Sequence, residues 1–115
     1  MTIQRFEPGP RLSTAVLHNG TAYLAGAVAD DPTADVKGQT EQILKQIEET
    51  LAGIGSQKSK ILSASVYLAN IGTFSEMNAV WDAWVDKSNP PARATIEARL
   101  AAPQYLVEIV VTAAV

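Results

Sequence analysis

The last apolar run of the sequence, LVEIVVTAAV, most constrains what this chain can fold into. Its alternating positions are apolar on both sides: Val107, Ile109, Val111 and Ala113 on one, and Leu106, Val110 and Ala114 on the other. Successive side chains of a strand point to opposite faces of a sheet, so the pattern predicts a strand that is buried on both faces. The chain must therefore fold around a sheet whose two faces are both covered.

Two predicted helices supply the cover on one face. Apolar residues spaced three or four apart predict a helix over roughly residues 35 to 53, ended by Gly53 and Gly55. A second helix follows Thr73-Phe74-Ser75-Glu76, which has the Thr-x-x-Glu form of a capping box. Its apolar stripe consists of Met77, Val80, Trp81, Trp84 and Val85. Both tryptophans are therefore expected in the core.

Strands are predicted on either side of these helices. Ala15 to Ala29 forms a hairpin around Asn19-Gly20, because this dipeptide tolerates the positive φ angles of a two-residue turn. The further strands are Ile61 to Leu68, Ala94 to Leu100 and Tyr105 to Ala114. The order β-β-α-β-α-β-β predicts an α+β fold, a mixed sheet with both helices packed on one face. No sequence remains to cover the other face, so a second copy of the chain is expected there, in a homo-oligomer.

Composition limits the classes of partner and cofactor. With 115 residues, 47% of them hydrophobic, the chain is expected to form one domain over residues 1–115. A net charge of −3 and scattered Lys and Arg argue against a nucleic-acid partner. A signal-peptide core and any apolar run near the roughly 18 residues of a membrane span are both lacking, so a soluble, cytoplasmic protein is expected. The single histidine, His18, and the absence of cysteine leave no credible zinc site, and no metal or cofactor is expected.

Arg93 is the first candidate for chemistry, because Pro90 and Pro91 fix the direction in which the chain enters its strand. A guanidinium there could anchor the carboxylate of a small molecule through two parallel hydrogen bonds. The alternative is a surface arginine or a structural salt bridge. Arg99 is a weaker candidate, because it shares a strand face with Thr95 and Glu97, which is typical of a solvated side.

Glu108 is the second candidate, because an unpaired carboxylate in a strand core would be costly. It must be paired, protonated or beside a cavity that holds water. A glutamate at a strand edge and an ion pair across a subunit boundary are the structural alternatives. If Glu108 instead lines the same cleft as Arg93, an anchor for a carboxylate and an acid–base group lie together in a hydrolytic site.

The sequence resembles a known family around these two residues. Pro91 to Glu97, PARATIE, followed by Val107-Glu108-Ile109, closely resembles the C-terminal signature of the RidA family, also called the YjgF family of reactive intermediate deaminases. The likeness continues through Tyr23-Leu24-Ala25-Gly26, Gly38-Gln39-Thr40 and Met77-Asn78-Ala79. It implies a chorismate-mutase-like fold and a trimer in which the uncovered sheet faces meet around a threefold axis.

The resemblance also implies an activity, the hydrolysis of 2-imino acids and their enamine tautomers to 2-keto acids and ammonia. The activity would be that of a 2-iminobutanoate/2-iminopropanoate deaminase, with its site between subunits and no cofactor. The family's substrate-anchoring arginine matches Arg93, and its water-orienting glutamate matches Glu108. Thr95 matches the position whose backbone helps to hold substrate or water, Gly26 matches a ligand-site glycine, and Asn78 matches a helix asparagine at the site.

Three positions depart from the family pattern. Ala25 replaces a frequent serine, Ala27 a frequent glutamine, and Leu12 aligns with a tyrosine. These changes remove polar contacts from the substrate site, so they leave open the range of imines and whether the activity is strong or vestigial. A binding module for keto acids is the first alternative function. An endoribonuclease, suggested by relatives reported to cleave RNA, is opposed by the acidic composition.

Overall fold

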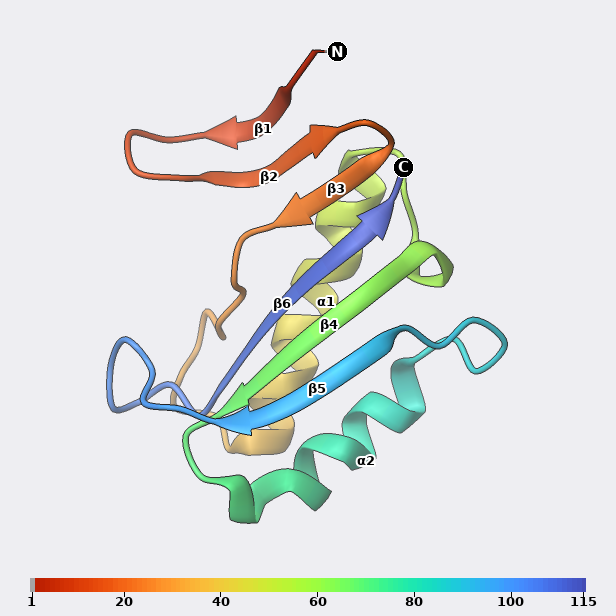
Figure 1. The fold of residues 1–115 in the computed structure, drawn as a ribbon. Helices are drawn as coiled ribbons and strands as arrows, with labels where there is room; N and C mark the ends of the chain where they lie inside the picture. The colour runs from red at the N-terminus through yellow and green to blue at the C-terminus, as the bar shows by residue number, and fades with distance from the viewer. Residues whose placement is uncertain (1) are drawn as a thin grey trace.

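The computed structural model describes residues 2–115 as a six-stranded sheet with two long helices (Figure 1). The strands are β1 (Gln4–Pro8), β2 (Ser13–His18), β3 (Thr21–Leu24), β4 (Ile61–Leu68), β5 (Ala92–Glu97) and β6 (Val107–Ala114). The helices are α1 (Val36–Gly53) and α2 (Phe74–Trp84), and short 3₁₀ turns span Lys58–Lys60 and Ile71–Thr73. None of the helices in this part of the chain combines the length and the apolarity needed to cross a membrane.

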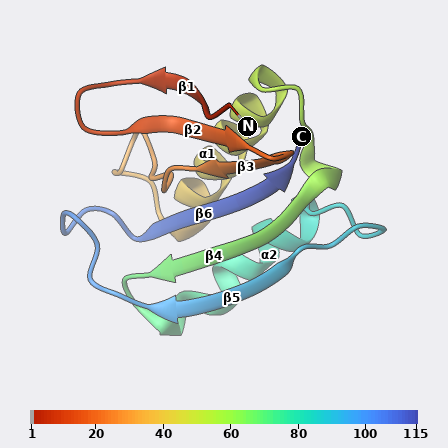
Figure 2. The ribbon, with the colours of Figure 1, turned by 45° about the horizontal axis from the view of Figure 1, so that its top comes forward.

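The sheet has the order β1-β2-β3-β6-β4-β5. Neighbouring strands are antiparallel except β4 and β5, which are parallel and connected through α2. Both helices lie on the same side of the sheet, α1 behind its centre and α2 behind β4 and β5 (Figure 2). The predicted α+β class, a mixed sheet with two helices on one face, is therefore confirmed.

The predicted strand order was incomplete, because the sheet has an additional edge strand, β1, which pairs with β2. Its side chains are exposed apart from Phe6, so the segment lacks the apolar alternation by which a strand is recognised in a sequence. Phe6 packs on the end of α1, where a Cβ added to Gly53 would lie 3.0 Å from its Cζ. Backbone pairing and this one ring hold a strand that the sequence pattern does not reveal.

The hairpin turn forms as predicted between β2 and β3. Asn19 and Gly20 have φ angles of 54° and 76°, the positive values that a type I′ turn requires. The second strand of the hairpin ends at Leu24, short of the predicted Ala29. Beyond it, the Ala25 N–H donates to the carbonyl of Thr14 on β2 at 2.9 Å. Ala27 then exchanges two backbone hydrogen bonds with Ile109 on β6, of 2.9 and 3.1 Å.

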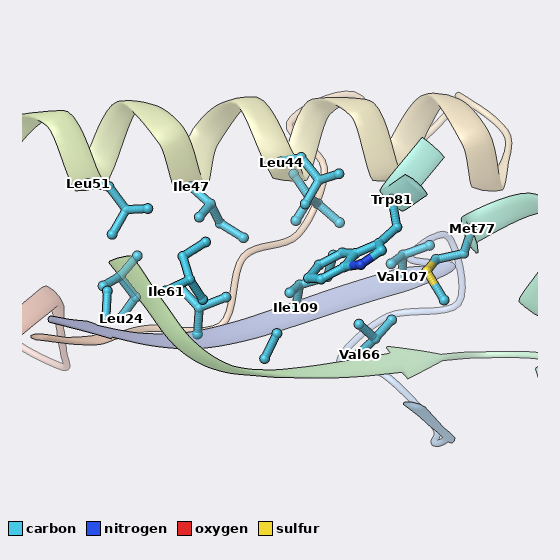
Figure 3. Packing of buried hydrophobic residues seen from close by; sticks show 14 of the residues in the cluster. Leu24, Leu44, Ile47, Leu51, Ile61, Val66, Met77, Trp81, Val107 and Ile109 are labelled. Carbon is cyan, nitrogen blue, oxygen red and sulfur yellow. The ribbon is translucent and has the colours of Figure 1, made fainter. Parts of the chain in front are cut away.

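The core fills the space between the sheet and the helices. Leu44, Ile47 and Leu51 from α1 and Met77 and Trp81 from α2 belong to one buried cluster and point toward the strands (Figure 3). On β6, Val107, Ile109, Val111 and Ala113 are at most 1% exposed and face the helices. The alternate residues of β6, Glu108, Val110, Thr112 and Ala114, are half-buried on the opposite face, which no helix covers. We call this second side of the sheet the open face.

The capping box predicted for α2 does not form. A 3₁₀ turn precedes the helix, so Thr73 has a nearly helical backbone and its side chain caps nothing. Its hydroxyl donates instead to the carbonyl of Asn70, 2.7 Å away. Asn70 caps the 3₁₀ turn that leads into the helix, because its Oδ1 accepts the Gly72 N–H at 2.8 Å.

The two C-terminal strands are shorter than predicted, because residues 98–106 form a loop between them. The loop is tied to α1 by Gln39, whose side chain is fully buried. Gln39 donates to the carbonyl of Gln104 at 3.1 Å and accepts the N–H of Leu106 at 3.0 Å. This loop sets the residue at which β6 begins.

Candidate active site

Arg93 lies on β5 with its side chain directed at the helix layer. In the parallel register, Arg93 is opposite Ala64 and Thr95 is opposite Val66, and both of these β4 residues face the core. Arg93 and Thr95 are accordingly half-buried, whereas Ala94 between them is exposed. The expectation that Thr95 lies on a solvated side was wrong, because α2 covers this face of β5.

The Arg93 guanidinium is held by aromatic rings and not by a carboxylate. Its Cζ lies 5.1 Å from the centre of the Trp81 ring and 5.7 Å from that of Phe74, both on α2. Within residues 2–115 it forms no ion pair. The structural alternative of an intrachain salt bridge is therefore not met, and a half-buried cation keeps its hydrogen-bond donors available to an anion.

Two buried oxygens in the same layer also lack a partner within the described residues. They are Asn78 Oδ1 on α2 and Thr95 Oγ1 on β5. Asn78 lies four residues after Phe74 and three before Trp81, so the three side chains share one face of the helix. Buried polar atoms are nearly always hydrogen-bonded, so two unpartnered ones near a free guanidinium are a reason to expect a ligand here. We call Arg93, Thr95 and Asn78 the anchor cluster.

Glu108 lies on β6, between two fully buried residues that face the helices, so its own side chain is on the open face. Its carboxylate rests on the backbone of Gly26. A Cβ added there would lie 3.1 Å from the carboxyl carbon of Glu108 and closer still to Oε2. Any other residue at position 26 would displace the carboxylate, so the glycine is required by the position of Glu108.

One copy of the chain does not bring Arg93 and Glu108 together. Arg93 points to the helix side of the sheet and Glu108 to the open face, with β4 between their strands. The anchor cluster lies at an edge of the sheet, because β5 is the last strand of the order. A common site for the two residues would require a second copy, whose open face lies against that edge.

Leu12, Ala25 and Gly26 line a hollow of about 200 Å³ between the ends of β2 and β3 and helix α1. Its wall is completed by Thr14, Leu24, Ala27 and three residues of α1, Gln46, Ile47 and Thr50. Leu12 is 61% exposed, so it forms the rim and not the floor. The three residues that the family pattern assigns to the N-terminal part of the site are thus brought together, beside the backbone that supports Glu108.

Larger hollows occur elsewhere and hold none of the predicted site residues. One, of about 650 Å³, lies between α1 and α2 and is lined by apolar residues such as Leu44 and Trp84 within a rim of lysines and glutamates. A second hollow of about the same volume lies beside the loop that follows β5. Neither hollow is lined by Asn78 or Thr95, the residues whose buried oxygens lack a partner within residues 2–115. The unpartnered atoms of the anchor cluster are the stronger indication of a site. No group of three metal-ligating side chains gathers anywhere in residues 2–115.

Comparison with known proteins identifies the family. The family model described as endoribonuclease L-PSP matches residues 2–115. The chain belongs to the YjgF/RidA family. Its relatives include a RutC family protein of Haemophilus ducreyi, 49% identical over 98% of this chain and 97% of the relative.

Solved structures of YjgF/RidA proteins have the same fold. NMB1025 of Neisseria meningitidis, a member of the YjgF protein family, has a TM-score of 0.96 and 46% identity over 99% of this chain and 95% of that one. YyfA of Yersinia pestis, described as a Rid family protein of unknown function, has a TM-score of 0.86 and 31% identity over 94% and 90% of the two chains. These matches establish the family and the fold, while the names of these three relatives assign no reaction.

Phe74 and Trp81 are residues of the candidate site that sequence reasoning missed. Trp81 was assigned to the core, where its ring does lie, and Phe74 only to the start of a helix. A signal was present in the spacing, since Phe74, Asn78 and Trp81 fall at i, i+4 and i+7 on one helical face. Periodicity marks such a face as apolar but cannot show that an arginine from a distant strand lies across it.

Proposed function

We propose that this protein hydrolyses 2-imino acids and their enamine tautomers to 2-keto acids and ammonia. The observation that carries the proposal is the anchor cluster, in which a half-buried arginine without an ion pair lies beside two buried oxygens without partners. A planar guanidinium pairs with the carboxylate that every 2-imino acid carries. Asn78 and Thr95 offer polar atoms to the nitrogen, or to water, next to that carboxylate.

Glu108 would supply the acid–base group of this reaction. Water attacks the iminium carbon while the Glu108 carboxylate takes one of its protons, which gives a carbinolamine. That proton then passes to the amine nitrogen, the C–N bond breaks, and ammonia leaves. As the carbonyl of the keto acid forms, the Glu108 carboxylate accepts the hydroxyl proton and then releases it to water. An iminium carbon is already electrophilic, so positioning and one proton acceptor suffice, and the reaction calls for no metal or cofactor.

The proposed site lies between copies of the chain in a homotrimer. Several large apolar side chains are left on the open face, among them Tyr23 and Ile96, which are 52% and 51% exposed. Apolar patches of this kind mark interfaces, and closed rotational symmetry is the usual form of a homo-oligomer. Covering the open face with the sheet edge of a neighbour would place the neighbour's anchor cluster near Glu108.

A coupled assay tests the function. An amino-acid oxidase generates imines from a panel of amino acids, and their loss is followed with and without the protein. Acceleration for one or more imines is expected. If no imine is hydrolysed faster but 2-keto acids bind, the protein is a binding module of the same fold. If instead RNA is cleaved and imines are not, the deaminase proposal is wrong.

A further inference from the structure

We propose that Phe74 and Trp81 form an aromatic clamp that fixes Arg93 in its anion-binding position before the substrate arrives. Both residues would be positioning residues, which act on the substrate through Arg93. The inference rests on the proposed function for its kinetic consequences. The position of the Arg93 side chain, by contrast, can be measured in the protein without any ligand.

The geometry of the clamp comes from one helical face. Phe74 and Trp81 are seven residues apart, two turns of α2, and present their rings to the same strand. The Cζ of Arg93 lies within 5.7 Å of both ring centres, inside the range of about 6 Å over which a cation is attracted to a ring. Two rings on a rigid helix therefore define where the end of a long, flexible side chain lies.

The clamp matters because nothing else in the described chain holds the guanidinium by charge. A carboxylate partner would orient Arg93 but would also occupy the N–H groups that a substrate carboxylate needs. Rings attract the guanidinium through its flat surface and leave the N–H groups at its edge free. The arginine is thereby ordered without being neutralised.

A second cation–ring contact on α2 shows what a purely structural pair looks like. Lys58 Nζ lies 5.4 Å from the centre of the Trp84 ring, and it also donates a hydrogen bond of 2.7 Å to the carbonyl of Trp84. That ammonium is held by a hydrogen bond to the protein as well as by a ring. Among the described residues, Arg93 contacts two rings but donates no hydrogen bond. Its N–H groups therefore stay available to an anion, unlike the ammonium of Lys58.

The test replaces Phe74, which is 37% exposed, because Trp81 is 6% exposed and its loss would disturb the core. Phe74→Leu keeps an apolar side chain but removes the ring, and Phe74→Tyr restores the ring. Phe6→Leu is the control, since it removes another partly buried ring, one that packs on Gly53 from β1, at the opposite edge of the sheet from Arg93. Each variant is compared with the parent as full-length protein of the same assembly state.

Phe74→Leu should raise KM for imines and Kd for 2-oxobutanoate by about 2- to 12-fold. This is the cost of ordering one long side chain on binding, about 0.5–1.5 kcal/mol, converted to a ratio. The kcat value should not change, because the carboxylate is held equally in the ground and transition states. Phe74→Tyr should keep both constants near the parent values, and so should Phe6→Leu.

A readout without ligand separates this inference from the proposed function. In the parent, the Nε–H resonance of Arg93 should be a single sharp signal shifted by the ring currents of the two aromatic residues. Phe74→Leu should move and broaden this signal, whereas Phe6→Leu should not. If the parent hydrolyses no imine, the proposed function fails, and this resonance still decides the clamp.

Two results would overturn the clamp. One is an Arg93 resonance and a Kd that do not change in Phe74→Leu. The other is a loss of 2-oxobutanoate affinity of the same size when Phe74→Leu is introduced into Arg93→Ala, because a residue that acts through Arg93 has no effect once Arg93 is gone. In that case Phe74 contacts the ligand itself.

Discussion

Gly26 shows how a single residue connects the fold to the chemistry. Its missing side chain leaves room for the carboxylate of Glu108, which lies against its backbone. The neighbouring Ala27 forms backbone hydrogen bonds with Ile109, so the segment that carries Gly26 is fixed to the strand that carries Glu108. The position of the proposed acid–base group therefore depends on an absence of atoms at residue 26.

Gly26→Ala should impair turnover far more than stability. The added methyl group would overlap Glu108 Oε2 and rotate the carboxylate away, so the loss should approach the roughly 10²–10⁴-fold that general acid–base catalysis contributes. Gly9→Ala is the matched control, because a Cβ there meets only the Leu12 carbonyl at 3.4 Å, an ordinary contact. Imine hydrolysis and melting temperature are measured for both. Equal turnover in the two variants would show that the carboxylate does not need its present position.

Arg93→Ala and Glu108→Gln should fail in different ways. Arg93→Ala removes a charge-assisted contact worth roughly 1.5–3 kcal/mol, so keto-acid binding and turnover should both fall. Glu108→Gln keeps the shape but cannot take a proton, so turnover should fall by about 10²–10⁴-fold with keto-acid affinity nearly kept. Calorimetry and the coupled assay measure the two quantities. Parent turnover in Glu108→Gln would make this residue structural, and unchanged binding in Arg93→Ala would remove the proposed site.

At the scale of elements, what the sequence predicts depends on how much of each element is buried. The bounds of α1 and β4 follow from apolar periodicity, because these elements bury a continuous face. β1 could not be predicted, since a single half-buried residue, Phe6, leaves no period to detect. The facing of Thr95 was misread for a related reason, because polar alternation on β5 looks solvated until α2 is placed over it.

The start of α2 gives a test at this scale. Asn70→Ala should lower the free energy of unfolding by about 0.5–2 kcal/mol, because Asn70 Oδ1 caps the turn that leads into the helix. Thr73→Ala should cost at most about 0.5 kcal/mol, since it removes only a surface hydrogen bond. Urea unfolding of both variants measures the difference. A larger loss for Thr73→Ala would restore the capping box as the helix start in solution.

At the scale of the whole molecule, one chain does not cover both faces of β6, although its apolar sequence predicts that both are covered. β6 is buried on its helix side, and its other side carries Val110 and Ala114 next to Glu108 on a face that no element covers. The sequence indicated both the missing cover and the two polar residues of the proposed site, Arg93 and Glu108. It could not indicate that these residues lie on opposite sides of the sheet, because that depends on strand register.

Mixing two inactive variants tests whether the site is shared between copies. If each site takes Arg93 from one copy and Glu108 from the next, a trimer that contains both Arg93→Ala and Glu108→Gln has one intact site of its three. Random co-assembly of equal amounts should then restore about a quarter of the parent turnover per chain, from variants that are each nearly inactive alone. Light scattering should first show a trimer for the parent, each variant and the mixture. Co-expression of the two chains is compared with simple mixing of the preformed assemblies, which should restore nothing until subunits exchange. A monomer in dilute solution, or a co-assembled mixture no more active than its components, would show that the proposed site between copies does not exist.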